Sequence, residues 1–120
     1  MKITKIERNN NVCAVVNSSE KIITDVQSAL ELLMTVNYEA ETKNIAISKE
    51  LITDDFFVLS TCLAGEILQK FINYGVRITI YGDYSKYTSN ALKDFIYESN
   101  KGKDVFFVST EDEAIEKLTN

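Results

Sequence analysis

Short apolar runs alternate along the chain with longer segments whose apolar positions recur every three or four residues. The apolar runs lie near 44–48, 76–82 and 104–109, and their brevity and β-branched content predict strands. The longer segments between and after them have the period of amphipathic helices. Because a helix separates each of these strands from the next, right-handed crossover connections make the three strands parallel.

The beginning of the chain predicts an antiparallel pair of strands instead. Residues 1–7 and 12–17 are strand candidates, and the tract Asn9-Asn10-Asn11 between them suits a hairpin turn because asparagine tolerates left-handed backbone. The predicted element order is therefore β-β-α-β-α-β-α-β-α. It indicates a single α/β domain over residues 1–120, with a mixed five-stranded sheet, an antiparallel opening hairpin followed by parallel strands, and helices on both faces.

The first predicted helix, from Asp25 to about Tyr38, is apolar over more than half of its circumference. Thr24 and Gln27 have the spacing of a capping box at its start. One packing face needs less apolar surface, so this helix is either flanked on two sides within the domain or in contact with a partner. Soluble monomers seldom expose large apolar patches, so the second alternative predicts a homodimer.

The second predicted helix begins near Asp54 and runs without interruption to Gly75, which can end it in a left-handed conformation. In such a helix Ser60 lies within the apolar stripe and bonds to a carbonyl one turn earlier, unless the helix starts at Ser60 or Thr61. Gly65 costs a helix interior about 1 kcal/mol relative to alanine, and close approach of another backbone would explain it.

The charge of the chain argues against several kinds of partner. Its 120 residues carry a formal net charge of -5 without any basic run, so we expect no general affinity for nucleic acid or anionic lipid. The amino terminus lacks the apolar core of a signal peptide, and no apolar stretch approaches the roughly 20 residues needed to cross a bilayer. We therefore expect a cytoplasmic protein that binds neither nucleic acid nor membrane.

The chain contains no histidine, which removes the usual general base near neutral pH and the commonest transition-metal ligand. Cys13 and Cys62 are the only thiols, and they lie far apart without the spacing of a zinc site. We therefore expect no metal and no cofactor, and we favour a non-catalytic protein over an enzyme.

Polar residues follow each predicted parallel strand, at the edge where such sheets bind ligands. The start of the second helix is expected at the same edge. If the protein binds a ligand, we expect contacts from seven residues: Glu50, Asp54, Ser60, Thr61, Asp83, Tyr84 and Ser85. Several of them belong to the residue types preferred in caps and turns, so a structural role is the competing interpretation.

Several strings of the sequence resemble a known family. They are Phe56-Phe57, L-A-G-E-I-L-Q-K-F at 63–71, Gly82-Asp83 and the segment 94–102. Together they resemble the bacterial domain of unknown function family 4180 over most of the chain. The resemblance implies a bacterial origin, and it implies no catalytic residues because that family has no established activity.

The element order also resembles the STAS domain, which sulfate transporters and anti-sigma-factor antagonists share. In those antagonists a serine at the start of the second helix accepts phosphate. The nearest counterparts here are Ser60 and Thr61, although the D-S-x-G context is missing. A phosphate on either residue would be repelled by the neighbouring carboxylates unless Lys49 or Lys86 lies close.

Two classes of function remain. The first is a non-catalytic regulatory or protein-interaction module that acts through a partner protein or a homodimer. The second is a small-molecule or anion-binding protein, or an enzyme, with its site at the carboxyl ends of the parallel strands. A buried pocket lined by Glu50, Asp83 and Tyr84 would favour the second class, and a flat, solvated edge would favour the first.

Overall fold

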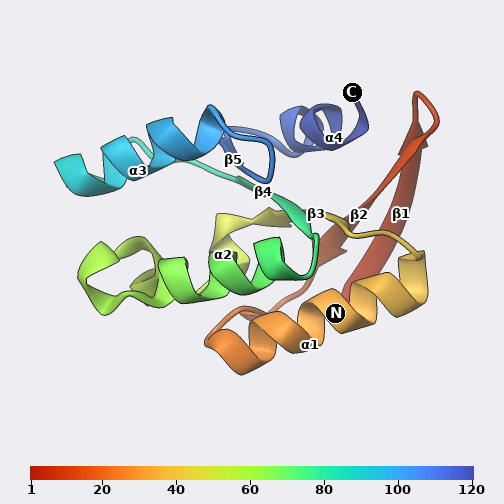
Figure 1. Ribbon diagram of the computed structural model, residues 1–120, viewed down its shortest axis with the longest axis horizontal. Coiled ribbons are helices and arrows are strands. Elements are labelled where there is room, and N and C mark those ends of the chain that lie inside the picture. The colour runs from red at the N-terminus through yellow and green to blue at the C-terminus, as the bar shows by residue number, and fades with distance from the viewer.

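The protein is built around one five-stranded sheet whose strands lie side by side in chain order, β1-β2-β3-β4-β5 (Figure 1). The computed structural model describes all 120 residues. The strands are β1 (Lys2–Arg8), β2 (Asn11–Asn17), β3 (Asn44–Ser48), β4 (Arg77–Tyr81) and β5 (Val105–Val108). The helices are α1 (Val26–Ala40), α2 (Leu63–Asn73), α3 (Asn90–Asn100) and α4 (Glu111–Thr119), with three short 3₁₀ turns, η1 (Lys49–Leu51), η2 (Asp54–Phe57) and η3 (Leu59–Thr61). The predicted α/β class and the order of strands and α-helices are confirmed.

The opening hairpin is antiparallel, and every other pair of neighbouring strands is parallel. Asn9 and Asn10 close the hairpin between β1 and β2 in left-handed conformations, with φ of 53° and 66°. The three strands predicted to be parallel are confirmed as β3, β4 and β5. β2 extends this parallel part of the sheet because it pairs with β3 in the same direction.

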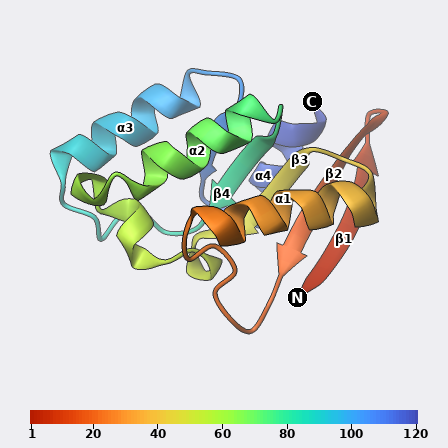
Figure 2. The ribbon, with the colours of Figure 1, turned by 60° about the horizontal axis from the view of Figure 1, so that its bottom comes forward.

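Three helices cover one face of the sheet, and α4 alone covers the other (Figure 2). The chain moves from β2 to β5 one strand at a time in one direction, so right-handed crossovers place α1, α2 and α3 on the same face. Side chains of β3 alternate accordingly. Ile45 and Ile47 belong to the large core beneath these helices, whereas Ala46 packs with Ile115 and Leu118 of α4. Coverage of both faces is therefore confirmed.

The capping residues of α1 lie one position further along the chain than the sequence pattern predicts. The N–H of Ser28 donates to the carboxylate of Asp25 at 2.7 Å, and the Ser28 hydroxyl accepts from the N–H of Asp25 at 3.0 Å. The predicted box of Thr24 and Gln27 is therefore wrong. Asp25 competes successfully with threonine because aspartate is at least as good an N-cap, and Ser28 completes the reciprocal pair.

The broad apolar surface of α1 is used within the domain. Leu32 and Val36 are only 2% and 0% exposed, because the helix packs against both the sheet and α2. Of the two alternatives predicted for this helix, the structure therefore shows the first, in which other parts of the same domain flank it on two sides. Met34 and Tyr38 remain outside, at 56% and 84% exposed.

The continuous helix predicted after β3 is wrong, because this stretch consists of η2, η3 and α2. Val58 takes an extended conformation between the two turns, and Cys62 takes a left-handed one, with φ of 64°, before α2. Phe56 and Phe57 are both buried within η2, and the breaks that follow leave Ser60 exposed rather than in the apolar stripe.

The two glycines of the α2 region differ in role. Gly75 ends the helix as predicted, with φ of 73° and its N–H donating to the Ile72 carbonyl at 3.0 Å. Gly65 has no neighbouring atom within 4 Å of the place where a Cβ would lie. The close approach of another backbone that would explain it is therefore absent, and nothing in the structure explains this glycine.

Candidate functional site

The strand order removes the usual place for a ligand in a parallel sheet. Such crevices open where the strand order reverses, and from β2 to β5 it never does. A hollow of about 670 Å³ nevertheless forms at the carboxyl edge of the sheet, between segment 54–60 and segment 86–92. We call it the strand-end hollow. It is lined by Asp54, Phe57, Val58, Leu59, Ser60, Lys86, Tyr87, Thr88, Ser89, Ala91 and Leu92.

Aromatic side chains form part of the wall of this hollow. The rings of Phe57 and Tyr87 stack with centroids 5.5 Å apart and planes inclined by 23°. Tyr84 packs against both rings at 6.2 and 6.1 Å, and its hydroxyl donates to the Ile80 carbonyl at 2.7 Å. The three aromatic residues join η2 to the loop after β4, so segments far apart in the sequence enclose one space.

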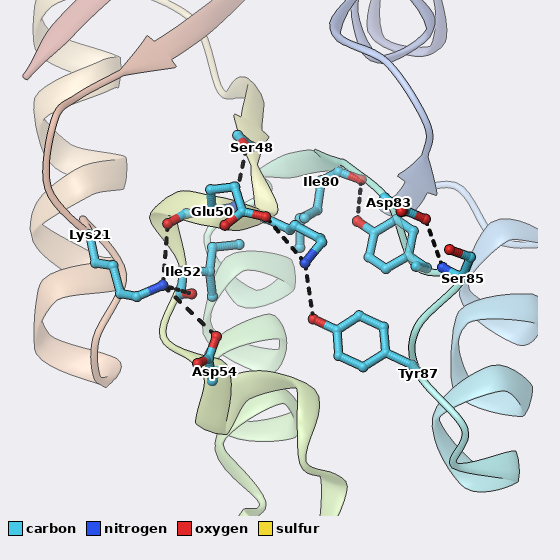
Figure 3. A network of polar contacts seen from close by, with 11 residues as sticks. Lys21, Ser48, Glu50, Ile52, Asp54, Ile80, Asp83, Ser85 and Tyr87 are labelled. Carbon is cyan, nitrogen blue, oxygen red and sulfur yellow. Dashed lines mark hydrogen bonds and ion pairs between the residues drawn. The ribbon is translucent and has the colours of Figure 1, made fainter.

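A buried lysine lies beside the aromatic wall. Lys49 directly follows β3, is 6% exposed, and is the only charged side chain among the buried residues. Its Nζ lies 3.3 Å from Tyr87 Oη and 3.3 Å from Glu50 Oε1, so a phenol and a carboxylate reach it from two sides (Figure 3). The same Nζ lies 5.1 Å from the centroid of the Tyr87 ring, within cation–π range.

Gly82 makes room for this lysine. The residue has φ of 155°, and a Cβ at this position would lie 2.6 Å from Cγ of Lys49. The lysine stem therefore crosses the end of β4 at a place where only glycine fits.

Opposing effects act on the pKa of Lys49. Burial lowers it, because desolvation disfavours the ammonium form. Hydrogen bonds and charge interactions with Tyr87 and Glu50 act in the opposite direction, and the net result is a raised pKa. Lys49 is therefore a cation at neutral pH and not an amine nucleophile.

Three of the seven predicted contact residues lie at or beside the hollow. Asp54 and Ser60 line it, and Glu50 contacts Lys49. Figure 3 shows the Asp54 carboxylate beside Lys21, with 3.9 Å between Oδ1 and Nζ. Asp54 is 96% exposed, so this ion pair is screened by water and contributes little to stability.

The other four predicted residues are near this edge but do not line the hollow. Thr61 Oγ1 lies 2.8 Å from two carbonyl oxygens of segment 55–58. Asp83 accepts the N–H of Ser85 at 2.9 Å, and hydrogen bonds from Ser85 hold the pKa of the Asp83 carboxyl below its usual value. The hydroxyl of Tyr84 is bonded to the backbone, and burial raises its pKa. The edge is thus neither flat nor a pocket lined by the residues expected from the sequence.

Sequence reasoning misses Phe57, Tyr87 and the buried position of Lys49. A signal for the lysine exists in the strand register, which pairs Ser48 with the last residue of β4. The residues that directly follow these two strands are Lys49 after β3 and Gly82 after β4. A glycine therefore stands beside a long side chain at the ends of two neighbouring strands. The aromatic pair has no comparable signal, because its two members come from separate segments.

A second hollow, of about 570 Å³, lies at the opposite edge and gathers three cations, Arg77, Lys103 and Lys117. Arg77 Nε donates to the Lys103 carbonyl at 3.0 Å, and its Nη2 donates to the Lys117 carbonyl at 3.4 Å. Helices α3 and α4 both end at this edge. Cations near helix carboxyl termini satisfy free carbonyls and the helix dipole, which accounts for this cluster without a ligand.

No three cysteine, aspartate or glutamate side chains lie close enough together to hold a metal ion. None of the helices combines the length and the apolar character that crossing a membrane requires.

Comparison with curated proteins and with solved structures finds no match to this chain. The model of one protein family, described as "Domain of unknown function (DUF4180)", matches residues 8–118. The match spans nearly the whole sequence, including both segments that line the strand-end hollow. The chain therefore belongs to the DUF4180 family of domains of unknown function.

Proposed function

We propose that this protein is a small-molecule-binding domain whose site is the strand-end hollow. The observation that carries the proposal is the stacked pair of Phe57 and Tyr87 in the wall of a hollow of about 670 Å³. Ligand pockets commonly have volumes of about 300–1,000 Å³ and combine apolar walls with a few polar groups. Here the polar groups are mainly the hydroxyls of Ser60, Thr88 and Ser89.

Binding fits the chemistry of the lining better than catalysis. The chain has no histidine, and the one carboxylate of the lining, Asp54, is 96% exposed and so keeps an ordinary aqueous environment. Lys49 is held as an ammonium ion by its partners. These groups therefore provide no buried general base for proton transfer.

A thermal-shift screen with a panel of aromatic fragments tests the proposal. A ligand that binds only the folded state raises Tm by mass action. Ala91 lines the hollow from the exposed surface of α3, so Ala91→Phe fills the space without changing the core. We expect the shifts seen with the wild type to disappear in Ala91→Phe and to remain in Gln27→Phe, a matched addition of a ring on the exposed part of α1. Equal shifts in both variants would contradict the site.

A second candidate function is the protein-interaction or homodimer role. It is supported by Met34, Tyr38 and Tyr74, which are 56%, 84% and 47% exposed. Met34 and Tyr74 also line a hollow of about 170 Å³. Sedimentation equilibrium would then give twice the mass of the chain for the wild type and for Tyr97→Ser, and the mass of one chain for Met34→Asp. A wild-type monomer would remove this candidate.

We also propose a reducing compartment, the cytoplasm, for this protein. Cys13 is buried and Cys62 is exposed, and both are free thiols. An exposed free thiol persists more readily where glutathione keeps thiols reduced. We expect the native host to be a bacterium, and fractionation of its cells should recover the protein in the cytoplasmic fraction. Recovery in another fraction would refute this assignment.

A further inference from the structure

We propose that the ligand of the strand-end hollow carries an anionic oxygen group, a carboxylate or a phosphate, on a flat apolar body. Tyr87 contacts the anion directly, and Lys49 positions Tyr87 and supplies positive charge behind it. This inference rests on the proposed function and adds the chemical class of the ligand. Its two supports are a buried ammonium ion and a residue of the hollow's lining, Tyr87, whose hydroxyl accepts from this ion.

Lys49 is held inside the protein although water is close. Its neighbour Glu50 is 73% exposed at the same edge, and a lysine in such a place ordinarily extends its ammonium to solvent. Nζ instead lies 6.0 and 5.1 Å from the ring centroids of Phe57 and Tyr87. Gly82 leaves the space that this conformation needs. The protein thus keeps the ammonium ion of Lys49 buried, although this ion would be better solvated in water.

The ammonium ion of Lys49 has one donor left over. A protonated lysine has three N–H donors, and the protein supplies two partners, Tyr87 Oη and Glu50 Oε1, each at 3.3 Å. Both contacts are longer than the roughly 2.7–2.9 Å of a strong charge-assisted hydrogen bond. The carboxylates of Glu50 and, at longer range, Asp83 are mostly in water, so they neutralise the cation incompletely.

Tyr87 links Lys49 to the lining of the hollow. Its oxygen accepts the hydrogen bond from Lys49, so its own hydrogen is available for another acceptor. The protein provides no acceptor for that hydrogen, and Tyr87 lines the hollow. A hydroxyl polarised by an ammonium ion binds a charged oxygen more strongly than a neutral one.

The charges around the hollow determine where the anion lies. Lys86 and the first turn of α3, which Ser89 caps, lie on the same side as Tyr87 and favour an anion. Asp54 lines the hollow from the η2 segment and disfavours one there. The anionic group therefore belongs beside segment 86–89, with the apolar body of the ligand against the rings.

Benzoate and benzamide test this inference because they share a ring and differ in charge. Each is titrated into the protein, and Kd is measured from NMR shifts of the amides of residues 86–92. We expect the wild type to bind benzoate at least about tenfold more tightly than benzamide, the scale of one hydrogen bond to a charged group. Tyr87→Phe and Lys49→Met should each reduce that preference below about threefold. Lys103→Met removes the same charge at the opposite edge and should keep the preference.

The outcomes separate this inference from the proposed function. Equal affinity for the two probes in the wild type overturns the inference and leaves the binding hollow in place. A preference that persists in folded Lys49→Met and Tyr87→Phe also overturns it. If no aromatic probe shifts the amides of the hollow, the proposed function itself fails. Phenyl phosphate, titrated in the same way, distinguishes the two anions, since tighter binding than benzoate assigns a phosphate and weaker binding assigns a carboxylate.

Discussion

Among single residues, Lys49 and Gly82 determine how the carboxyl edge is built. They occupy equivalent positions after β3 and β4, and the stem of the lysine fills the space that a side chain at position 82 would take. The lysine thereby reaches Tyr87 and Glu50 instead of bulk water. A charged residue that directly follows an apolar strand is in this way kept among the least exposed side chains of the protein.

Substitution of Gly82 measures this contact. Gly82→Ala places a Cβ 2.6 Å from Lys49 Cγ at a φ of 155°, so we expect a loss of about 1–3 kcal/mol in the free energy of unfolding. Gly65→Ala is the control, because that glycine lies within a helix and faces open space, and it should gain about 0.5–1 kcal/mol. Urea denaturation of both variants provides the comparison. Equal effects would show that Lys49 moves aside without cost.

Tyr81 predicts a pH dependence at the same edge. Burial, with the nearby charge of Glu111 and a hydrogen bond to it at 3.2 Å, raises the pKa of Tyr81 to about 12. A raised pKa favours the neutral phenol in the folded state. The resulting stability is complete below the unfolded pKa of about 10 and is lost as pH rises through about 12. Ultraviolet titration should show one phenol ionising near 12 in the wild type and not in Tyr81→Phe, and an unchanged curve would refute the assignment.

At the scale of elements, the interrupted stretch between β3 and α2 forms one side of the candidate site. Its apolar residues recur with helical spacing, so sequence reasoning predicts one helix there. Tertiary contacts decide otherwise. Phe57 packs on Tyr84 and Tyr87, and the Thr61 hydroxyl lies within hydrogen-bond distance of the carbonyls of Asp55 and Val58. The sequence contains no local signal for either contact, whereas strands and caps depend on neighbours a few residues away.

A pair of substitutions tests the role of Thr61 in this break. Thr61→Val keeps the shape of the side chain and removes the hydroxyl that lies 2.8 Å from two carbonyls, so we expect a loss of about 1 kcal/mol in the free energy of unfolding. Ser60→Ala, at the neighbouring exposed position, should change it by less than about 0.5 kcal/mol. Thermal unfolding gives both values. A larger effect at Ser60 than at Thr61 would contradict the observed hydrogen bonding.

At the scale of the whole molecule, the connections between strands explain both the layers and the place of the hollow. Every crossover from β2 to β5 advances by one strand, so three helices share a face and no crevice opens between strands. The space at the carboxyl edge instead lies between the turns that precede α2 and the loop that precedes α3. Strand pairing and layer order follow from short-range patterns in the sequence. The hollow does not, because Phe57, Tyr87 and Lys49 meet only after the sheet has formed.

A crystal structure of the protein with the best fragment from the thermal-shift screen tests the central claim most directly. We predict the fragment in the strand-end hollow, with its ring against Phe57 and Tyr87 and its polar group beside segment 86–89. Crystals of Ala91→Phe grown with the same fragment should contain no fragment in the strand-end hollow. A fragment bound instead in the second hollow beside Arg77, with the strand-end hollow filled only by water, would contradict the account.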